Sequence, residues 1–347
     1  MTLTNNQKGI LLAFAGVMLL TPDSLLIRLI TLDTWSLLFY RSLVPGLFLF
    51  ILSAIYVRKN FINFFFNAGS RGLINSLFIV SGNIFFILAL QNTNVANALV
   101  MISLVPLIAA IISFFALAEK LDFYTTLAIL LCFIAVVFIF YDSIGSGRLL
   151  GDFYGILAAI SVASSLVVIR SSSEKNFIPS YVMGKLLTAL ISSFVVSSFV
   201  ISTYDLSFIL LMIFTVGISF IFITFAPRFI SASQVGLFFL LETALGPIIV
   251  WYFINETPSL NTIIGAICII IIIFIHSIYM LKKIDTITKI KSELKKDPNK
   301  NLIIVIVSIA AFFFLLWAST TDTGKKIWDS EYRECREFWR EFVCKQD

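Results

Sequence analysis

Charged side chains are scarce in this sequence. Only 13% of its 347 residues are Asp, Glu, Lys or Arg, whereas soluble domains have about 25%. At half the usual density, these side chains cannot cover the surface of a water-soluble protein of this size. Hydrophobic residues make up 59% of the chain. The composition therefore predicts that lipid is the main solvent of the protein.

The residues of common catalytic and metal sites are also missing. A single histidine, His276, cannot form a metal site, and the four cysteines include no CxxC pair. The sequence has no HExxH, GxSxG or GxxxxGK[ST] motif and no paired intramembrane aspartates. We therefore expect no enzyme, no cofactor and no ATP-driven pump. Cys132 and Cys268 are predicted to be small core residues, and His276 a packing or lipid-interface residue.

Long apolar runs are what the sequence has in abundance. A helix needs about 20 mostly apolar residues to cross a hydrocarbon core of about 30 Å, and lipid offers no partners to open backbone groups. A β-barrel would show alternating stretches of about 10 residues instead. We predict an all-α integral membrane protein with spans near 9–29, 34–57, 72–91, 95–117, 124–141, 151–170, 180–202, 207–226, 232–254 and 261–280, and an eleventh apolar run at 302–319.

The distribution of basic residues predicts the orientation of these spans. When the N-terminus is placed in the cytoplasm, most basic loop residues lie on the inner side, as the positive-inside rule requires. The inner residues are Arg58, Lys59, Arg71, Lys120, Arg170, Lys175 and Arg228, and the outer ones are Arg28 and Arg148. The net charge of +5 is thus assigned to membrane orientation, and nucleic acid is not expected as a partner.

A weak internal repeat divides the spans into two groups of five. A shift of about 137 residues places the third to fifth spans on the eighth to tenth, and Glu119 then meets Glu256 at the same loop. An odd number of spans in each half gives the two halves opposite orientations in the membrane. Such inverted repeats are typical of secondary transporters, whose substrate site lies between the halves.

The predicted organisation has five parts. Residues 1–142 form the first five-helix repeat and 143–281 the second, inverted one. Residues 282–300 form a basic amphipathic cytoplasmic linker on the anionic inner leaflet. Residues 301–320 are an additional transmembrane helix, which would place the C-terminus outside. Residues 321–347 are an amphipathic tail with a heptad-like apolar stripe. A protein partner that binds this tail is one of the open alternatives.

Several motifs resemble one transporter family. The stretch 240–247 reads LLETALGP, residues 255–258 read NETP, and the first spans contain PDSLLIR at 22–28 and FYR at 39–41. Over residues 8–280 the chain resembles the EamA-type proteins of the drug/metabolite transporter superfamily. The resemblance implies a ten-span carrier with a central cavity, and many such proteins export metabolites or amino acids. Residues 281–347 depart from this pattern.

Ionisable residues inside spans are the first candidates for a site, because each costs roughly 2.5–3.5 kcal/mol to insert. Glu242 lies near the middle of the ninth span. Its carboxyl group would either line a cavity, binding a cation or a proton, or be a protonated packing residue. Asp23 and Arg41 lie at similar depth in the first two spans and are predicted to pair, either as a gate or binding pair or as a structural bridge.

Asn83, Thr243 and Arg28 complete the set of candidates for substrate binding or coupling. Asn83 is in the middle of the third span, Thr243 follows Glu242, and Arg28 is near the interface, where it can reach water. Lys185 and Arg170 are interpreted as topology anchors near the cytoplasmic face. Pro22, Pro106 and Pro247 each fall within an apolar run and are expected to bend their helices.

These observations favour a transporter in the cytoplasmic (inner) membrane of a cell. We expect a secondary transporter that moves a small polar metabolite, amino-acid-like or another organic solute, by alternating access. Export is the expected direction, and coupling to protons and a homodimer are open. The alternative is a membrane scaffold or receptor that uses a carrier fold and acts through its C-terminal tail, residues 321–347.

Overall fold

A computed structural model describes residues 5–58, 61–93, 95–119, 122–141, 149–255 and 260–291. The chain divides into two units, Met1–Asp285 and Thr286–Asp347. Of the second unit only residues 286–291 are described, as the end of a helix. The predicted extra span at 301–320 and the tail at 321–347 lie outside the described residues, as do residues 292–300 of the predicted linker at 282–300.

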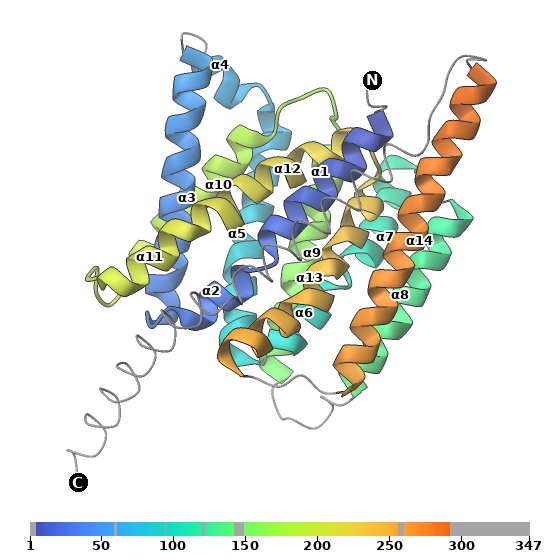
Figure 1. The fold of residues 1–347 in the computed structure, drawn as a ribbon. Helices are drawn as coiled ribbons and strands as arrows, with labels where there is room; N and C mark the ends of the chain where they lie inside the picture. Colours follow the sequence, from blue (N-terminus) through green and yellow to red (C-terminus); the bar gives the residue numbers. More distant parts are fainter. Residues whose placement is uncertain are drawn as a thin grey trace, which may run out of the picture. The chain divides into compact units, whose positions relative to one another are not determined.

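The first unit is built from helices, and its described residues include no strand (Figure 1). The helices of the first predicted half are α1 (Asn5–Leu20), α2 (Asp23–Leu29), α3 (Thr34–Val57), α4 (Phe61–Phe66), α5 (Gly69–Asn92), α6 (Val95–Ile102), α7 (Val105–Leu117) and α8 (Phe123–Tyr141). Those of the second are α9 (Leu149–Arg170), α10 (Ile178–Ser193), α11 (Thr203–Met212), the π-helix η2 (Ile213–Ile218), α12 (Ser219–Phe225), the 3-10 turn η3 (Ala226–Arg228), α13 (Ala232–Ile254) and α14 (Leu260–Lys291).

Seven of the described helical segments are long and apolar enough to cross a membrane. They are Asn5–Leu29, Thr34–Val57, Gly69–Asn92, Ala98–Leu117, Leu150–Arg170, Thr203–Arg228 and Ala232–Ile254. Each coincides with a span predicted from the sequence, so the all-α, multi-pass membrane class is confirmed. Two shorter apolar helices, Phe123–Ala135 and Ile263–His276, lie in α8 and α14. The count of ten spans stays a prediction.

The seventh predicted span, 180–202, is wrong at its end. α10 ends at Ser193, and residues 194–202 are not helical. Valine and serine dominate this stretch, and both disfavour helix relative to alanine or leucine. The Ser202 hydroxyl oxygen then caps α11 by accepting the backbone N–H of Asp205. The 16 residues of α10 span about 24 Å, which is less than the thickness of a hydrocarbon core.

Three of the long helical segments are interrupted. Thr21–Pro22 separates α1 from α2, and Ser103–Leu104 separates α6 from α7 directly before Pro106. These two breaks agree with the predicted proline bends, because proline has no backbone N–H to donate to a helical hydrogen bond. Pro247 lies inside α13, which continues through it. The third interruption, the π-helix at Ile213–Ile218, contains no proline.

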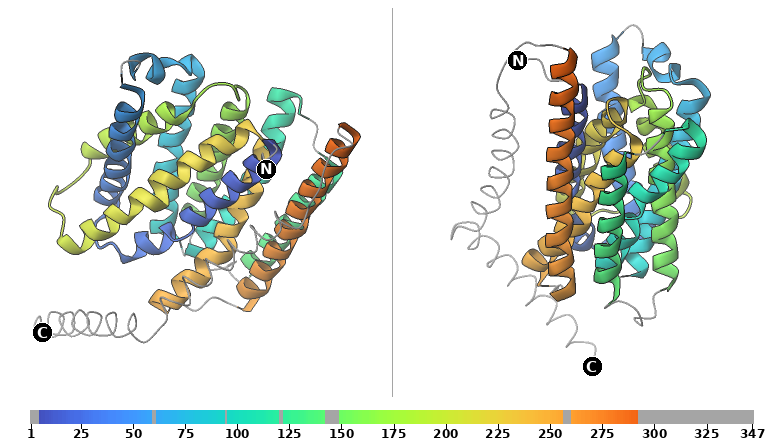
Figure 2. Two further views of the ribbon diagram at one scale, coloured as in Figure 1. Left: turned by 45° about the horizontal axis from the view of Figure 1, so that its top comes forward. Right: turned by 90° about the vertical axis from the view of Figure 1, so that its right-hand side faces the viewer.

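Helices of the two halves pack against one another in a reciprocal way (Figures 1 and 2). α1 of the first half packs on α12 and α13, whereas α9 of the second packs on α5 and α7. α3 packs on α10, and α7 on α13. In the predicted repeat, α5 of the first half is equivalent to α12 of the second, and α7 is equivalent to α13. The helix α9 therefore makes the contacts to the first half that α1 makes to the second.

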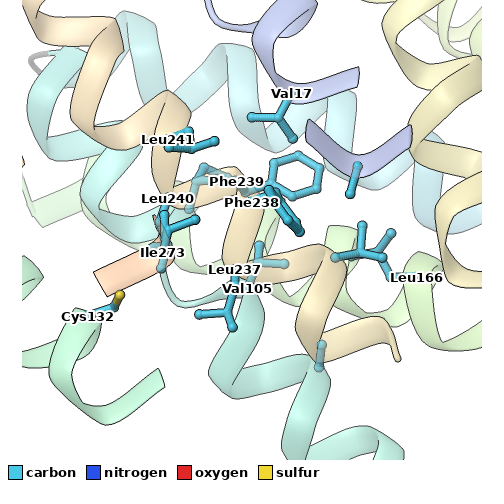
Figure 3. Close-up of a cluster of buried hydrophobic side chains, with 14 of the residues drawn as sticks. Val17, Val105, Cys132, Leu166, Leu237, Phe238, Phe239, Leu240, Leu241 and Ile273 are labelled. Atoms are coloured by element: carbon cyan, nitrogen blue, oxygen red, sulfur yellow. The ribbon is translucent and has the colours of Figure 1, made fainter. Parts of the chain in front are cut away.

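α13 lies at the centre of the apolar core (Figure 3). Five successive residues, Leu237 to Leu241, are all buried, so this helix has no face in contact with lipid along this stretch. Its approach to α7 depends on Gly236, where an added Cβ would lie 2.8 Å from the Cα of Pro106. Such a distance is shorter than any van der Waals contact, so only glycine fits here without movement of the backbone.

We therefore expect Gly236→Ala to lower the stability of the protein by about 1–3 kcal/mol, as overpacking does in other cores. The measurement is the melting temperature of the purified protein in detergent. Gly82→Ala is the matched control, because its Cβ would meet the nearest atom, the Cβ of Ser161, at 3.5 Å, an ordinary contact. Equal melting temperatures for the two variants would contradict the close approach of α7 and α13.

Candidate functional site

A cavity lies between the two predicted halves of the chain. Its lining comes from α1, α2, α3, α5 and α6 of the first half and from α9, α10, α12 and α13 of the second. The centres of water-sized molecules can occupy about 80 Å³ of it, which is enough for roughly six waters. Most of its lining residues are apolar or aromatic, and its ionisable side chains are Asp23, Arg41, Tyr181 and Glu242.

Asp23 and Arg41 form a buried ion pair at one side of this cavity. Nη2 of Arg41 lies 2.5 Å from Oδ2 of Asp23, and Nε lies 3.4 Å from Oδ1, so the guanidinium group contacts both carboxylate oxygens. The Arg41 side chain is 3% exposed and the Asp23 side chain is 0% exposed. The pair joins the start of α2, just after the Pro22 break, to the first third of α3. The predicted pairing is confirmed.

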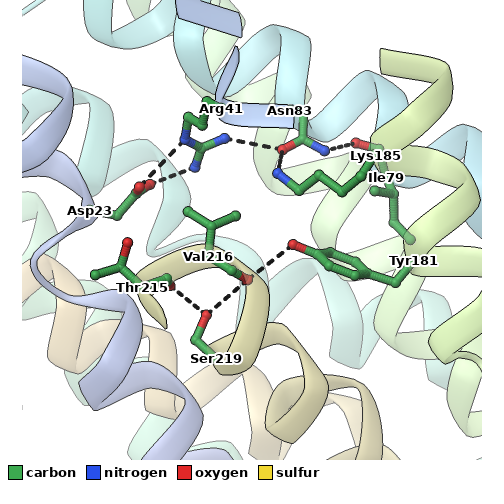
Figure 4. A network of polar contacts seen from close by, with 9 residues as sticks. All are labelled: Asp23, Arg41, Ile79, Asn83, Tyr181, Lys185, Thr215, Val216 and Ser219. Atoms are coloured by element: carbon green, nitrogen blue, oxygen red, sulfur yellow. Dashed lines mark hydrogen bonds and ion pairs between the residues drawn. The ribbon is translucent and has the colours of Figure 1, made fainter. Parts of the chain in front are cut away.

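Asn83 extends the ion pair into a network (Figure 4). Its Oδ1 accepts hydrogen bonds from Nη1 of Arg41, at 3.1 Å, and from Nζ of Lys185, at 2.7 Å. Its Nδ2 donates to the backbone oxygen of Ile79 at 2.8 Å, which fixes the orientation of the amide. One amide oxygen on α5 thus holds cations from α3 and α10, which belong to different halves.

Lys185 corrects one prediction from the sequence. It was expected to be a topology anchor near the cytoplasmic face, but its side chain is 1% exposed and points into the network. No carboxylate forms an ion pair with it among the described residues. The signal was present in the sequence, because a lysine inside an apolar helix meets the same criterion of insertion cost that selected Glu242.

Aromatic rings face both cations of the network. The guanidinium carbon of Arg41 lies 5.6 Å from the ring centre of Phe86, and Nζ of Lys185 lies 5.8 Å from that of Tyr181. Both distances are in the range of cation–π attraction. Phe220 stacks on Tyr181 with 5.0 Å between ring centres. The aromatic rings of the lining therefore stabilise positive charge.

The π-helix provides a backbone oxygen to the same region (Figure 4). The hydroxyl group of Tyr181 donates to the carbonyl of Val216 at 3.1 Å, and the hydroxyl group of Ser219 donates to the carbonyl of Thr215 at 2.5 Å. A π-turn leaves carbonyl groups accessible to side chains, and such turns are frequent at functional sites. The interruption between α11 and α12 thus contacts α10 beside the network, through the ring that faces Lys185.

Glu242 is the one carboxylate of the cavity lining outside the ion pair. Its side chain, from the middle of α13, is 2% exposed, and its Oε1 atom has no hydrogen-bond partner among the described residues. A buried polar atom without a partner is costly. Glu242 thus lies in the cavity lining, as one of its two predicted roles requires, and its part in binding a cation or a proton stays a prediction.

Two of the six candidates lie away from the cavity lining. Thr243 is buried, and its hydroxyl group donates to the backbone oxygen of Leu99 at 3.0 Å, tying α13 to α6 close to the break before Pro106. Arg28 is exposed, and its guanidinium group donates to the backbone oxygen of Thr93 at 3.1 Å. Their roles in binding or coupling stay predictions.

The single histidine and the cysteines have structural positions. His276 is buried in α14 and lies 3.1 Å from the hydroxyl oxygen of Thr125 in α8, as a packing residue would. Cys132 is buried, as predicted, but Cys268 is exposed, so its predicted place in the core is wrong. No group of three or more potential metal ligands occurs in the described parts of the chain.

Contacts between the halves also close one end of the bundle. Nε of Arg170 lies 2.7 Å from Oε1 of Glu119, linking α9 to the end of α7. Arg71 at the start of α5 donates to the backbone oxygen of Ser171, in the loop after α9, at 3.0 Å. We name these contacts the end clasp. They lie in the loops that the sequence assigns to the cytoplasmic side.

A comparison with protein families decides the identity of the fold. The model of the EamA-like transporter family matches residues 7–141 and again residues 149–278. The chain belongs to the EamA-like transporter family. The two matches cover the two predicted halves in turn, and the cavity of this EamA-like protein lies between the matched segments.

A solved structure, titled only as the crystal structure of a protein, has the same fold. It superposes with a TM-score of 0.64 at 16% identity, over 79% of this chain and 98% of that one. None of the curated proteins compared with the chain matches it. The EamA-like fold is thus clear, while the solute must be inferred from the site itself.

The ion pair of this EamA-like site makes a prediction about stability. Asp23→Asn should cost about 3–5 kcal/mol, because it leaves the buried guanidinium group of Arg41 without its counter-charge. The double variant Asp23→Asn/Arg41→Gln removes both charges and should recover part of this loss. Melting temperatures in detergent test both statements. A double variant that loses as much as the sum of the two single variants would contradict the pairing.

Proposed function

We propose that this EamA-like protein is a secondary transporter that moves a small polar organic solute, such as an amino-acid-like metabolite, out of the cell by alternating access. The observation that carries this proposal is the cavity between the two halves, because its lining includes Glu242, whose Oε1 atom has no hydrogen-bond partner among the described residues. Because a transporter must bind its solute where both halves can move around it, a polar group at this interface is the expected place for the binding site.

The proposed topology has ten spans in two inverted halves, with the N-terminus in the cytoplasm and the protein in the inner membrane. The reciprocal packing of α1 and α9 supports a twofold relation between the halves. Five spans in each half would make the relation an inversion. α10 would then cross most of the hydrocarbon core, and the mostly exposed, non-helical residues 194–202 would lie at the outer face, joined to α3 by the hydrogen bond from Tyr40 to the carbonyl of Phe199, at 2.6 Å.

Alternating access would require the end clasp to open. Its partners come from opposite halves: Glu119 and Arg71 from the first, and Arg170 and Ser171 from the second. Rotation of one half against the other would break these contacts and open the cavity to the cytoplasm. An ion pair that is about a quarter exposed, as this one is, contributes only about 0–1 kcal/mol, so the clasp can open at little cost.

The proposed energy source is the proton gradient. The sequence contains no GxxxxGK[ST] nucleotide-binding loop, and Glu242 supplies the cavity lining with a carboxyl group, a type of group that takes up and releases protons. Proton uptake and solute binding at one carboxylate would exclude one another, which couples the two fluxes. Asp23 is less suited to this role, since its charge is neutralised by Arg41 at 2.5 Å.

The alternative function, a scaffold or receptor acting through the tail 321–347, depends on residues outside the described part of the chain. A protein partner for the tail and a homodimer likewise stay predictions. No observation on the described residues favours the scaffold over the carrier, so the transport proposal is the one that the geometry supports.

The proposal predicts saturable flux in vesicles. Proteoliposomes and empty liposomes are loaded with a mixture of cell metabolites, and mass spectrometry identifies the solutes whose efflux depends on the protein. Glu242→Gln should reduce that efflux at least about tenfold, because loss of a charged hydrogen-bonding group is worth roughly 1.5–3 kcal/mol.

Glu174→Gln is the matched control. It makes the same chemical change on an exposed side chain outside the cavity lining and leaves the backbone unchanged, so efflux should stay at the level of the unmodified protein. If no solute in the mixture leaves the vesicles faster with the protein than without it, the transport proposal is wrong. Unchanged efflux in Glu242→Gln would instead remove the proposed role of this residue.

A further inference from the structure

The charges of the cavity lining do not cancel. Three strongly acidic or basic side chains face the cavity, and Asp23 and Arg41 neutralise one another at 2.5 Å. Glu242 is left as the uncompensated one. Lys185 does not balance it from within the lining, because its ammonium group is directed to Oδ1 of Asn83 at 2.7 Å and the lysine is not among the lining residues. With Glu242 ionised, the lining has a net negative charge.

The carboxylate of Glu242 is therefore suited to a cationic ligand. It is 2% exposed, and its Oε1 atom has no hydrogen-bond partner among the described residues. A buried carboxylate is stabilised by an opposite charge that also donates hydrogen bonds. An ammonium group supplies both. An anionic ligand would be repelled by Glu242, and three nitrogens of the Arg41 guanidinium group already contact Asp23 and Asn83.

The aromatic lining adds a second attraction for positive charge. Two of the five lining rings, Phe86 and Tyr181, already lie within 5.6 Å and 5.8 Å of cationic groups of the protein. Phe239 also lines the cavity and precedes Glu242 by three residues on α13. Residues three apart share one face of a helix, so a ring and a carboxylate are presented together. This combination is the one that proteins use to bind organic ammonium groups.

The remainder of the lining is suited to an apolar body. Leu20, Ile102, Val162 and Leu166 face the same space, and all four are aliphatic. A fully hydrated inorganic cation would gain little from such walls, whereas an alkyl or aromatic group attached to an ammonium would be removed from water at a gain of about 25 cal/mol per Å². The ligand must also be small, because the centres of water-sized molecules have only about 80 Å³ available.

We infer that the solute of this cavity is a small organic cation, an ammonium group on an apolar body, bound with its charge between the Glu242 carboxylate and the Phe239 ring. This inference rests on the proposed function and names its substrate class. It goes beyond a polar solute in general, since it orders three types of ligand of equal size: the amine binds best, and the neutral and anionic analogues bind weakly or not at all.

The test uses the purified full-length protein in detergent and probes of matched size. Phenethylamine, which is cationic at neutral pH, is compared with 2-phenylethanol, 3-phenylpropanoate and the zwitterion phenylalanine by calorimetric titration. We expect the amine to bind at least about tenfold more tightly than the alcohol, as a net gain of about 1.4 kcal/mol from the ion pair requires. The anion should show no binding.

Two variants locate the site. Glu242→Gln should abolish the preference for the amine over the alcohol, whereas Glu174→Gln should keep it. Phe239→Leu should weaken amine binding by about three- to thirtyfold, the range between an exposed and a desolvated cation–π contact. Phe238→Leu is its control, because Phe238 is the adjacent ring of the same core but is not a lining residue (Figure 3). Size-exclusion chromatography checks that each variant is folded.

Equal affinity for amine and alcohol, tighter binding of the zwitterion or the anion, absence of amine binding, or an amine preference that survives in Glu242→Gln would each overturn the inference. The titration needs no transport, so its outcome is separate from that of the vesicle experiment. Amine binding that depends on Glu242, without any protein-dependent efflux, would contradict transport alone. Efflux confined to non-cationic solutes would contradict the inference alone.

Discussion

The cost of placing charge in a medium of low dielectric constant governs the centre of this protein. Each ionisable side chain in a span costs roughly 2.5–3.5 kcal/mol, and the network around Asn83 distributes that cost over several partners. Asp23 neutralises Arg41, the amide of Asn83 accepts from both Arg41 and Lys185, and rings face the two cations. These contacts allow charged side chains to line a cavity inside an apolar bundle.

The interruptions of the helices serve the same end. Asp23 begins α2 directly after the break at Thr21–Pro22, and the π-helix between α11 and α12 exposes the carbonyl that Tyr181 reaches. Non-helical backbone at membrane depth is tolerated only where protein or water satisfies its polar groups. These two breaks thus lie beside the network, and the uninterrupted α13 carries Glu242 in the lining of the same cavity.

The free-energy cost of placing an ionisable side chain in a membrane span identified Glu242, Asp23 and Arg41 from the sequence. The similar depth of Asp23 and Arg41 in their spans then predicted that these two residues pair. Lys185 was missed because its distance from a cytoplasmic loop was given more weight than its apolar neighbours. The aromatic lining could not be predicted, since the chain has 36 phenylalanines and a ring facing lipid looks the same in sequence as one facing a cavity. Hydropathy could not predict that α10 ends at Ser193, because a valine has the same hydropathy in a helix as in a non-helical segment.

A water-accessible cavity bounded by both halves is the central claim, and cysteine labelling tests it most directly. In a background without native cysteines, Ile79→Cys and Ser165→Cys place single thiols on the lining of the first and second halves, and Val17→Cys places one in the core, where Val17 is 0% exposed. The account predicts that a charged, membrane-impermeant thiol reagent, applied separately to inside-out and right-side-out vesicles, modifies the first two thiols from at least one side and does not modify the third. Equal protection of all three thiols would contradict it.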